Sequence, residues 1–295
     1  MDYKIALQCA YLAQDVYQDF SRVSFRGWPR AQPALIEHPA SDTQLAILED
    51  PDAKLAVIVF RGSDAGKDWG TNLKMGRQEY EWSRKEKKEY KQQLKQVRGT
   101  LAEEGELIYP QAYGKASGPV KMHRGFMTAY LSVREAIHHY VNNSSATQYR
   151  IVGHSLGGAL AKLCAVDLQY NFASNTGILT DSNIHVETYT FGAPRAGNKA
   201  FVASYNARVP NTWRVVNGWD AVSGLPRMWQ GYRHTETLVK LDRAFTWRII
   251  TARIADHFMT GYIKSLEATV IKQVSDSVVQ AQENAYASER APKRA

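Results

Sequence analysis

Apolar positions recur at helical spacing near the start, in the middle and at the end of the chain. From Tyr3 to Phe20 they recur every three or four residues, and the same spacing predicts a second helix over Gly125–Val141. After Gly261 the spacing predicts a last helix, and the polar residues 287–295 predict a disordered tail. We therefore expect amphipathic helices packed on a central body.

Short apolar runs between these helices have the length of buried strands. Helical stretches alternate with the later runs, which predicts an α/β fold with a mostly parallel sheet. The expected strands are Gln44–Leu48, Lys54–Phe60, Tyr149–Val152, His185–Phe191, Thr212–Val216 and Thr235–Leu241; the expected helices among them are Leu156–Tyr170 and Asn198–Asn206. The sequence contains no internal repeat and no Gly/Ser-rich linker, so residues 1–295 are predicted to form one domain.

Residues 64–122 differ in composition from the rest and are predicted to form an insertion within this domain. Between Arg77 and Glu106 there are eight basic and seven acidic residues. An apolar stripe with helical spacing runs through them, formed by Tyr90, Leu94, Val97 and Leu101. This pattern predicts a surface helix with one narrow apolar edge.

Composition and charge limit the class of protein further. A 295-residue chain that is 44% hydrophobic predicts a soluble globular protein. No apolar run approaches the roughly 18 residues that cross a bilayer, and no signal-like segment opens the sequence. A cytoplasmic location is therefore expected, and signal-independent export is the alternative. Cys9 and Cys164 lack metal-ligand spacing and are expected to be reduced and buried. The net charge of +8 is spread without a nucleic-acid motif, so it favours an anionic lipid surface over a nucleic-acid partner.

A Gly-x-Ser-x-Gly sequence lies directly between a predicted strand and a predicted helix. It consists of Gly153, His154, Ser155, Leu156 and Gly157. Flanking glycines let the strand and the helix approach closely, and the sharp turn projects the Ser155 hydroxyl above the sheet. The helix start also directs free N–H groups and a positive dipole end at the reacting oxygen. We therefore predict a nucleophile elbow with Ser155 as the nucleophile.

A serine nucleophile needs a base and a carboxylate that orients the base, and in this architecture they follow in the order serine, acid, histidine. Asp220 follows a predicted strand, at the edge of the sheet where sites form. Asp167 lies within the helix after the elbow, and Asp181 lies in a polar loop. Asp220 is therefore the predicted acid, whereas chain order alone leaves His257 and His234 as alternative bases.

Ester hydrolysis also needs N–H donors directed at the oxyanion, each worth about 3 kcal/mol. The N–H of Leu156 lies in the elbow itself. A second donor is expected in the loop that leaves an earlier strand, where Ser63 follows the Gly62 turn. Ser63 and Leu156 are the predicted oxyanion hole, and the chemistry implies no metal and no cofactor.

Several short motifs occur in a fixed order between residues 57 and 262. They are Phe60-Arg61-Gly62-Ser63, Asp68-Trp69 with Asn72, His123-Arg124-Gly125-Phe126, the elbow through Ala159, and the run from Thr190 to Asn198. With these motifs the sequence resembles the class 3, fungal-type lipases, which are α/β-hydrolases. The resemblance implies that Ser155, Asp220 and His257 form the triad. It also places His234 in a structural Tyr-x-His element.

Members of that family carry a lid between the oxyanion loop and the His-x-Gly-Phe motif. The resemblance implies that the apolar edge within residues 77–106 covers the site when closed; the alternative is a solvated surface helix without a gating role. This interval is longer and more charged than in fungal lipases, and the chain lacks their disulfides and signal peptide. Extracellular fat digestion therefore does not follow from the resemblance.

Together these inferences predict a serine hydrolase of the triacylglycerol lipase type that cleaves lipid esters. Its expected partners are a lipid or ester substrate and a lipid–water interface or anionic membrane surface. The charged segment leaves a short-acyl or feruloyl-type esterase open, and the positive charge leaves a phospholipase on anionic membranes open. A lipase-like scaffold without activity is the non-enzyme alternative, but every expected catalytic position is filled.

Overall fold

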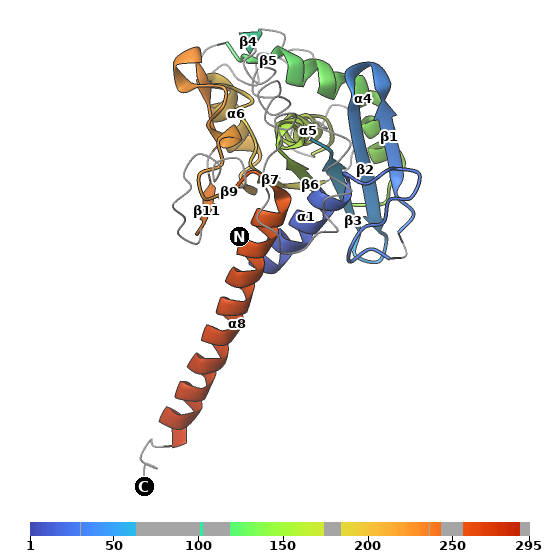
Figure 1. Ribbon diagram of the computed structural model, residues 1–295. Coiled ribbons are helices and arrows are strands. Elements are labelled where there is room, and N and C mark those ends of the chain that lie inside the picture. Colours follow the sequence, from blue (N-terminus) through green and yellow to red (C-terminus); the bar gives the residue numbers. More distant parts are fainter. Residues whose placement is uncertain are drawn as a thin grey trace, which may run out of the picture.

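A computed structural model gives the fold. It describes residues 1–29, 31–62, 101–102, 119–173, 184–235, 237–242 and 256–289. A central seven-stranded sheet runs through the body (Figure 1). In sheet order its strands are β1 (Ala34–His38), β2 (Thr43–Asp50), β3 (Leu55–Phe60), β6 (Gln148–His154), β7 (His185–Phe191), β9 (Thr212–Asn217) and β11 (Leu238–Leu241). The pairs from β3 to β11 are parallel, whereas β1, β2 and β3 are joined antiparallel.

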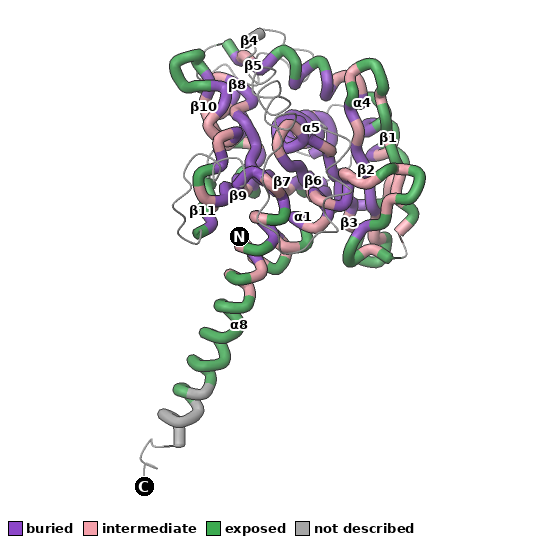
Figure 2. Tube along the Cα trace, viewed as in Figure 1, coloured by how far each residue is buried: buried purple, intermediate pink, exposed green. Residues whose placement is uncertain are grey.

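Helices cover both faces of this sheet. They are α1 (Tyr3–Asp15), α4 (Arg124–Asn143), α5 (Leu156–Phe172), α6 (Lys199–Arg208) and α8 (Met259–Glu289). One hydrophobic cluster joins α4, α5 and α6 to one face, and a second joins α1 and the start of α8 to the other face. Because α5 is buried along almost its whole length, its polar face is narrow and its start is held firmly above the sheet (Figure 2).

A second, small sheet lies beside the central one. Its strands, in order, are β10 (Tyr232–Arg233), β8 (Gly197–Asn198), β5 (Met122–His123) and β4 (Leu101–Ala102), all paired antiparallel. The sequence pattern did not indicate this sheet, because two-residue strands show no periodicity. Short 3-10 helices η1 (Pro39–Ser41), η4 (Val222–Gly224) and η5 (Met228–Gln230) complete the described elements.

The helix α8 begins against α1 and then projects away from the body (Figures 1 and 2). Tyr262 and Leu266, near its start, are buried between the two helices and the sheet. Farther along, apolar side chains stand in solvent: Ile271, Val274, Val278 and Val279 are each about half exposed or more. Among the described residues no helix is long and apolar enough to cross a membrane.

The predicted α/β architecture with a mostly parallel sheet is confirmed, and most boundaries shift by only one to three residues. Three predictions about helices are wrong. Leu101 does not lie on a helix, because its backbone pairs with His123 in the β4–β5 ladder, and Gly99 two residues before it is a poor helix former. The tail expected from residue 287 is helical as far as Glu289, because α8 continues through its alanines. The first helix also ends at Asp15 rather than at Phe20.

Candidate active site

The sharp turn between β6 and α5 holds Ser155 in a strained backbone conformation, with φ 55° and ψ −127°. Its N–H donates to the carbonyl of Phe191 at 2.9 Å, which fixes the turn to the neighbouring strand β7. A Cβ atom on Gly153 would lie 2.2 Å from the carbonyl oxygen of Gly157. Only glycine fits there, so strand and helix approach each other closely at this turn, which is the geometry that a nucleophile elbow needs.

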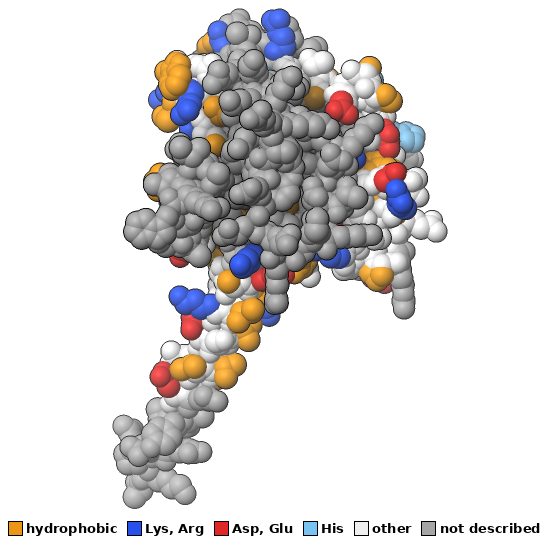
Figure 3. All heavy atoms as spheres, viewed as in Figure 1, with side chains coloured by type: hydrophobic (Ala, Val, Ile, Leu, Met, Phe, Trp, Pro, Cys, Tyr) orange, Lys and Arg blue, Asp and Glu red, His pale blue; other side chains and the backbone are white. Residues whose placement is uncertain are grey.

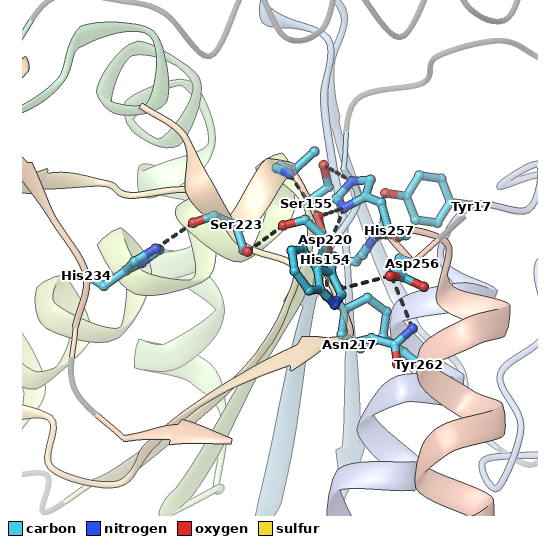
Figure 4. Close-up of polar contacts among 12 residues, drawn as sticks. Tyr17, His154, Ser155, Asn217, Asp220, Ser223, His234, Asp256, His257 and Tyr262 are labelled. Atoms are coloured by element: carbon cyan, nitrogen blue, oxygen red, sulfur yellow. Dashed lines mark hydrogen bonds and ion pairs between the residues drawn. The ribbon is translucent and has the colours of Figure 1, made fainter. Parts of the chain in front are cut away.

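The side chain of His257 lies between Ser155 and Asp220 (Figure 4). Its Nε2 is 2.9 Å from the Ser155 Oγ, and its Nδ1 is 2.8 Å and 3.0 Å from the two carboxylate oxygens of Asp220. A proton on Nδ1 satisfies the carboxylate and leaves Nε2 free to accept the serine proton. The structure thus brings together three residues that lie far apart in the sequence, in an arrangement that can activate a hydroxyl.

Asp220 follows β9 and is buried. Its carboxylate faces His257 and two further hydrogen-bond donors. The Val222 N–H donates to Oδ1 at 2.8 Å, and the Tyr262 hydroxyl donates to Oδ2 at 2.6 Å. Burial by itself would raise the pKa of Asp220, but the His257 ring and these hydrogen bonds outweigh it and hold the pKa below its usual value. Asp220 is therefore an anion at neutral pH and can stabilise a positive charge on His257.

A second buried histidine, His154, supports the first. Its Nε2 donates to the backbone carbonyl of His257 at 2.7 Å, so Nδ1 is the acceptor for the Tyr17 hydroxyl at 2.9 Å. Burial and the neighbouring His257 lower the pKa of His154 to about 3, which keeps the ring neutral. In the sequence His154 is marked only as part of the predicted elbow, and no local pattern points to Tyr17, because 137 positions separate the two residues.

The loop before α8 is attached to the end of β9 by polar contacts. Asp256 accepts a hydrogen bond from the Trp219 N–H at 2.9 Å, and its carbonyl accepts one from the Asn217 side chain at 3.3 Å. Asn217 in turn accepts from Ser265 on α8 at 3.0 Å. These contacts bring the neighbours of His257 and of Asp220 together, so they set the relative position of base and acid (Figure 4).

His234, the alternative base, lies away from Ser155 (Figure 4). Its Nε2 donates to the Ser223 carbonyl at 2.6 Å. Burial and the charges of Lys162, Arg214 and Arg195 lower the pKa of His234 to about 2, so this ring does not take up a proton near neutral pH. The geometry therefore favours His257 over His234 as the partner of Ser155.

The remaining predicted site residues divide between described and undescribed parts of the chain. Leu156 is the first residue of α5, beside Ser155. Ser63 and the expected lid residues Tyr90, Leu94 and Val97 lie outside the described residues, and only the backbone of Leu101 is described. Within the described ranges no group of three His, Cys, Asp or Glu side chains is arranged to hold a metal ion.

The chain is similar in sequence to known lipases. The sequence profile of the family described as "Lipase (class 3)" matches residues 57–229. "Lipase" from Rhizomucor miehei is 30% identical over 199 residues, which cover 65% of this chain and 43% of that protein. "Secreted mono- and diacylglycerol lipase LIP1" from Malassezia globosa is 29% identical over 136 residues, or 44% of this chain and 41% of that protein. The matched region spans less than half the length of these curated relatives.

Solved lipase structures share the fold. Lip2 lipase from Yarrowia lipolytica superposes with a TM-score of 0.61 at 18% identity, covering 82% of this chain and 80% of that one. Rhizomucor miehei triacylglyceride lipase gives a TM-score of 0.55 at 22% identity, covering 81% and 79%. Both confirm the predicted α/β-hydrolase fold.

The expected cytoplasmic location is contradicted by the relatives. Those from Malassezia globosa and Fusarium solani are named as secreted lipases. The prediction rested on the missing signal-like segment at the start of this sequence, a local pattern that does not report where a family acts. The family profile itself covers more than half of the chain and includes the elbow and Asp220. The chain belongs to the class 3 lipase family.

Proposed function

We propose that this protein is a carboxylic ester hydrolase that cleaves acyl esters of lipids, with Ser155, His257 and Asp220 as its catalytic residues. One observation carries the proposal. The hydroxyl of Ser155, whose backbone is strained, lies 2.9 Å from the Nε2 of His257, and the Nδ1 of His257 faces the buried carboxylate of Asp220. Membership of a lipase family supports the same chemistry.

In the first half of the reaction the Ser155 Oγ attacks the ester carbonyl carbon while its proton passes to His257 Nε2. The Asp220 carboxylate stabilises the imidazolium that results, and the donors around Asp220 keep it ionised. The N–H of Leu156, at the start of α5, faces the developing oxyanion, and Ser63 is proposed as the second donor.

The tetrahedral intermediate then collapses to an acyl-enzyme. His257 returns its proton to the departing alcohol oxygen, so that a neutral alcohol leaves. In the second half a water molecule gives a proton to His257 while its oxygen attacks the acyl carbon. His257 then returns that proton to the Ser155 Oγ as the bond to the acyl carbon breaks, and the carboxylic acid leaves. His154 and Tyr17 hold the His257 backbone during both halves, because His154 remains neutral and keeps its bond to the His257 carbonyl.

The substrate class follows from the relatives, whose names include mono- and diacylglycerol lipases. We therefore propose acylglycerols, and the same names support action outside the cell. The alternatives are a short-acyl esterase, a phospholipase and an inactive scaffold. Hydrolysis assays distinguish them from a lipase that acts on acylglycerols.

The test is hydrolysis of p-nitrophenyl esters of increasing acyl length, below and above the concentration at which the substrate forms an interface, with Ser155→Ala as the matched control. Preference for long chains with a rise at the interface supports a lipase. Short-chain preference without a rise would make the protein an esterase. Equal rates for the wild type and Ser155→Ala would contradict the proposed catalytic serine.

A further inference from the structure

The 3-10 helix η5 forms an exposed aromatic tip, which we define as Met228 and Trp229. Trp229 is 80% exposed and Met228 is 54% exposed, although both are large apolar side chains that are usually covered. In the space-filling view hydrophobic and basic side chains gather together at the upper left corner of the molecule (Figure 3), where Figure 2 places β10 and β8, the strands next to η5.

The backbone below the aromatic tip is fixed. Gly231 closes the turn with φ 89°, and its N–H donates to the Met228 carbonyl at 3.0 Å. The Arg233 guanidinium donates to the same carbonyl at 2.9 Å, and the Arg195 guanidinium donates to the Pro226 carbonyl at 2.7 Å and to the carbonyl of Gly224. A tip held in this way presents its side chains to a partner with little loss of conformational entropy.

Positive charge surrounds the aromatic tip. The Arg227 guanidinium lies 5.6 Å from the centre of the Trp229 ring, and the Arg233 guanidinium donates to the backbone carbonyl of Met228. The β10–β8 ladder pairs Tyr232 with Asn198, so the exposed Lys199 follows next to the same corner. No Asp or Glu occurs in residues 197–208 or 222–233, which contain β8, α6, η5 and β10, so the positive charge is not balanced by acidic neighbours within these segments.

We infer that the aromatic tip and its basic surround form a docking site for an anionic lipid surface. A tryptophan with an apolar body and a polar N–H partitions into the headgroup region of a bilayer, and arginine and lysine beside it attract anionic headgroups. A soluble polyanion such as heparin would need the positive charge but not the projecting Met228 and Trp229 side chains. The combination of both favours lipid.

This inference deepens the proposed function, because it names the surface on which a lipid esterase of this kind would work. The aromatic tip is linked to the catalytic acid by one short segment: Ser223 donates to the Asp220 carbonyl at 2.8 Å, and Pro226 leads directly into η5. The docking site and the proposed catalytic site therefore lie on the same loop system. Binding can nevertheless be measured without hydrolysis.

The experiment measures co-sedimentation of the full chain with vesicles of phosphatidylcholine alone and with three parts in ten phosphatidylserine, in a Ser155→Ala background throughout. Trp229→Ala is expected to weaken binding to the anionic vesicles about tenfold. Arg227→Gln combined with Lys199→Gln is expected to weaken it about 25-fold, or about fivefold for each charge. Vesicles of phosphatidylcholine alone should bind weakly in every variant.

Matched controls lie on α8, where Ile271 and Lys272 are also exposed. Ile271→Ala and Lys272→Gln remove the same kinds of group far from the aromatic tip and should leave vesicle binding unchanged. Hydrolysis of soluble p-nitrophenyl butyrate by the tip variants, with Ser155 intact, should equal that of the wild type and shows that they fold.

Two results would overturn the inference. Equal losses in the tip and α8 variants would show that binding is unspecific. Heparin binding that depends on Arg227 and Lys199, together with vesicle binding that does not depend on Trp229, would identify a site for soluble polyanions instead. Absence of ester hydrolysis in the wild type would contradict the proposed function but leave the vesicle result valid.

Discussion

Two buried histidines of this protein lie in opposite electrostatic surroundings. His257 faces the carboxylate of Asp220 and the hydroxyl of Ser155. His234 faces cations, and burial together with Lys162, Arg214 and Arg195 lowers its pKa to about 2. Chain order after Ser155 allows either residue as the base. The difference teaches that the charge beside an imidazole, rather than its position in the sequence, determines whether it can accept a proton during a reaction.

Replacing each of the two histidines by alanine tests this comparison, and one of these substitutions has the largest expected effect on kcat. His257→Ala should lower kcat for a p-nitrophenyl ester by about 10⁴ to 10⁶, because the base of the serine is lost. His234→Ala should change kcat by less than about tenfold, because among the described residues that ring bonds to a loop carbonyl and not to Ser155. Steady-state kinetics of both purified variants, with circular dichroism as a control for folding, measure the difference. Similar losses in kcat would reverse the assignment.

Removing the charge next to His257 should have the next largest effect. Asp220→Asn keeps the size of the side chain but removes the anion that orients and stabilises the imidazolium, so kcat should fall by about 10⁴. A matched change on the surface, Asp276→Asn on the exposed part of α8, should leave kcat unchanged. If Asp220→Asn keeps more than a tenth of the wild-type kcat, another carboxylate orients His257.

Removing a charge from the surroundings of His234 should alter stability. Burial, with Arg214 and Arg195, lowers the pKa of Lys162 from 10.5 to about 7. Below pH 7 the buried charge destabilises the folded state fully; between about 7 and 10.5 the unfolded state binds more protons, so the unfolding free energy rises with pH. Lys162→Met should therefore stabilise the protein by about 1–4 kcal/mol below pH 7, and this gain should shrink toward pH 10.5.

Urea unfolding between pH 6 and pH 10 measures this effect of Lys162→Met. Lys199→Met, at an exposed position, is the control and should show no such pH dependence. A gain from Lys162→Met that stays constant over this range would mean that Lys162 does not titrate in the folded state.

The smallest expected effect comes from removing one hydrogen bond to Asp220, the partner of His257. Tyr262→Phe removes the 2.6 Å bond to Asp220 and should lower kcat about tenfold with little change in KM, because the ring packing stays. Tyr205→Phe removes a buried hydroxyl bonded to Thr212 and is the matched control for stability. A change in KM without a change in kcat would place Tyr262 in substrate binding instead.

Local patterns predicted much of the fold and the elements that carry the candidate site. The strand before Ser155 and the helix after it were predicted because glycines and apolar periodicity act over a few residues. The strands β2 and β3 were predicted in the same way, and they pair antiparallel across a turn that contains Pro51. The strand β1 was missed, because its apolar residues Ala34, Leu35 and Ile36 are consecutive and do not alternate with polar ones, so they show no strand periodicity.

Contacts between distant residues could not be predicted from local patterns. The bonds of Tyr17 to His154 and of Tyr262 to Asp220 depend on how α1 and α8 pack on the sheet. The choice between His257 and His234 likewise depends on the charges that the fold brings beside each ring. The resemblance to a family resolved this choice in the sequence analysis, and the contacts give its physical reason.

The projecting helix α8 has a practical consequence for how this protein can be handled. Its 31 residues span about 46 Å, and only the first turns contact the body. A label or surface linkage attached near Asn284, which is exposed, would lie on the part of α8 that projects away from the body. The same helix makes the particle elongated, so its diffusion and sedimentation in solution should be slower than those of a sphere of the same mass.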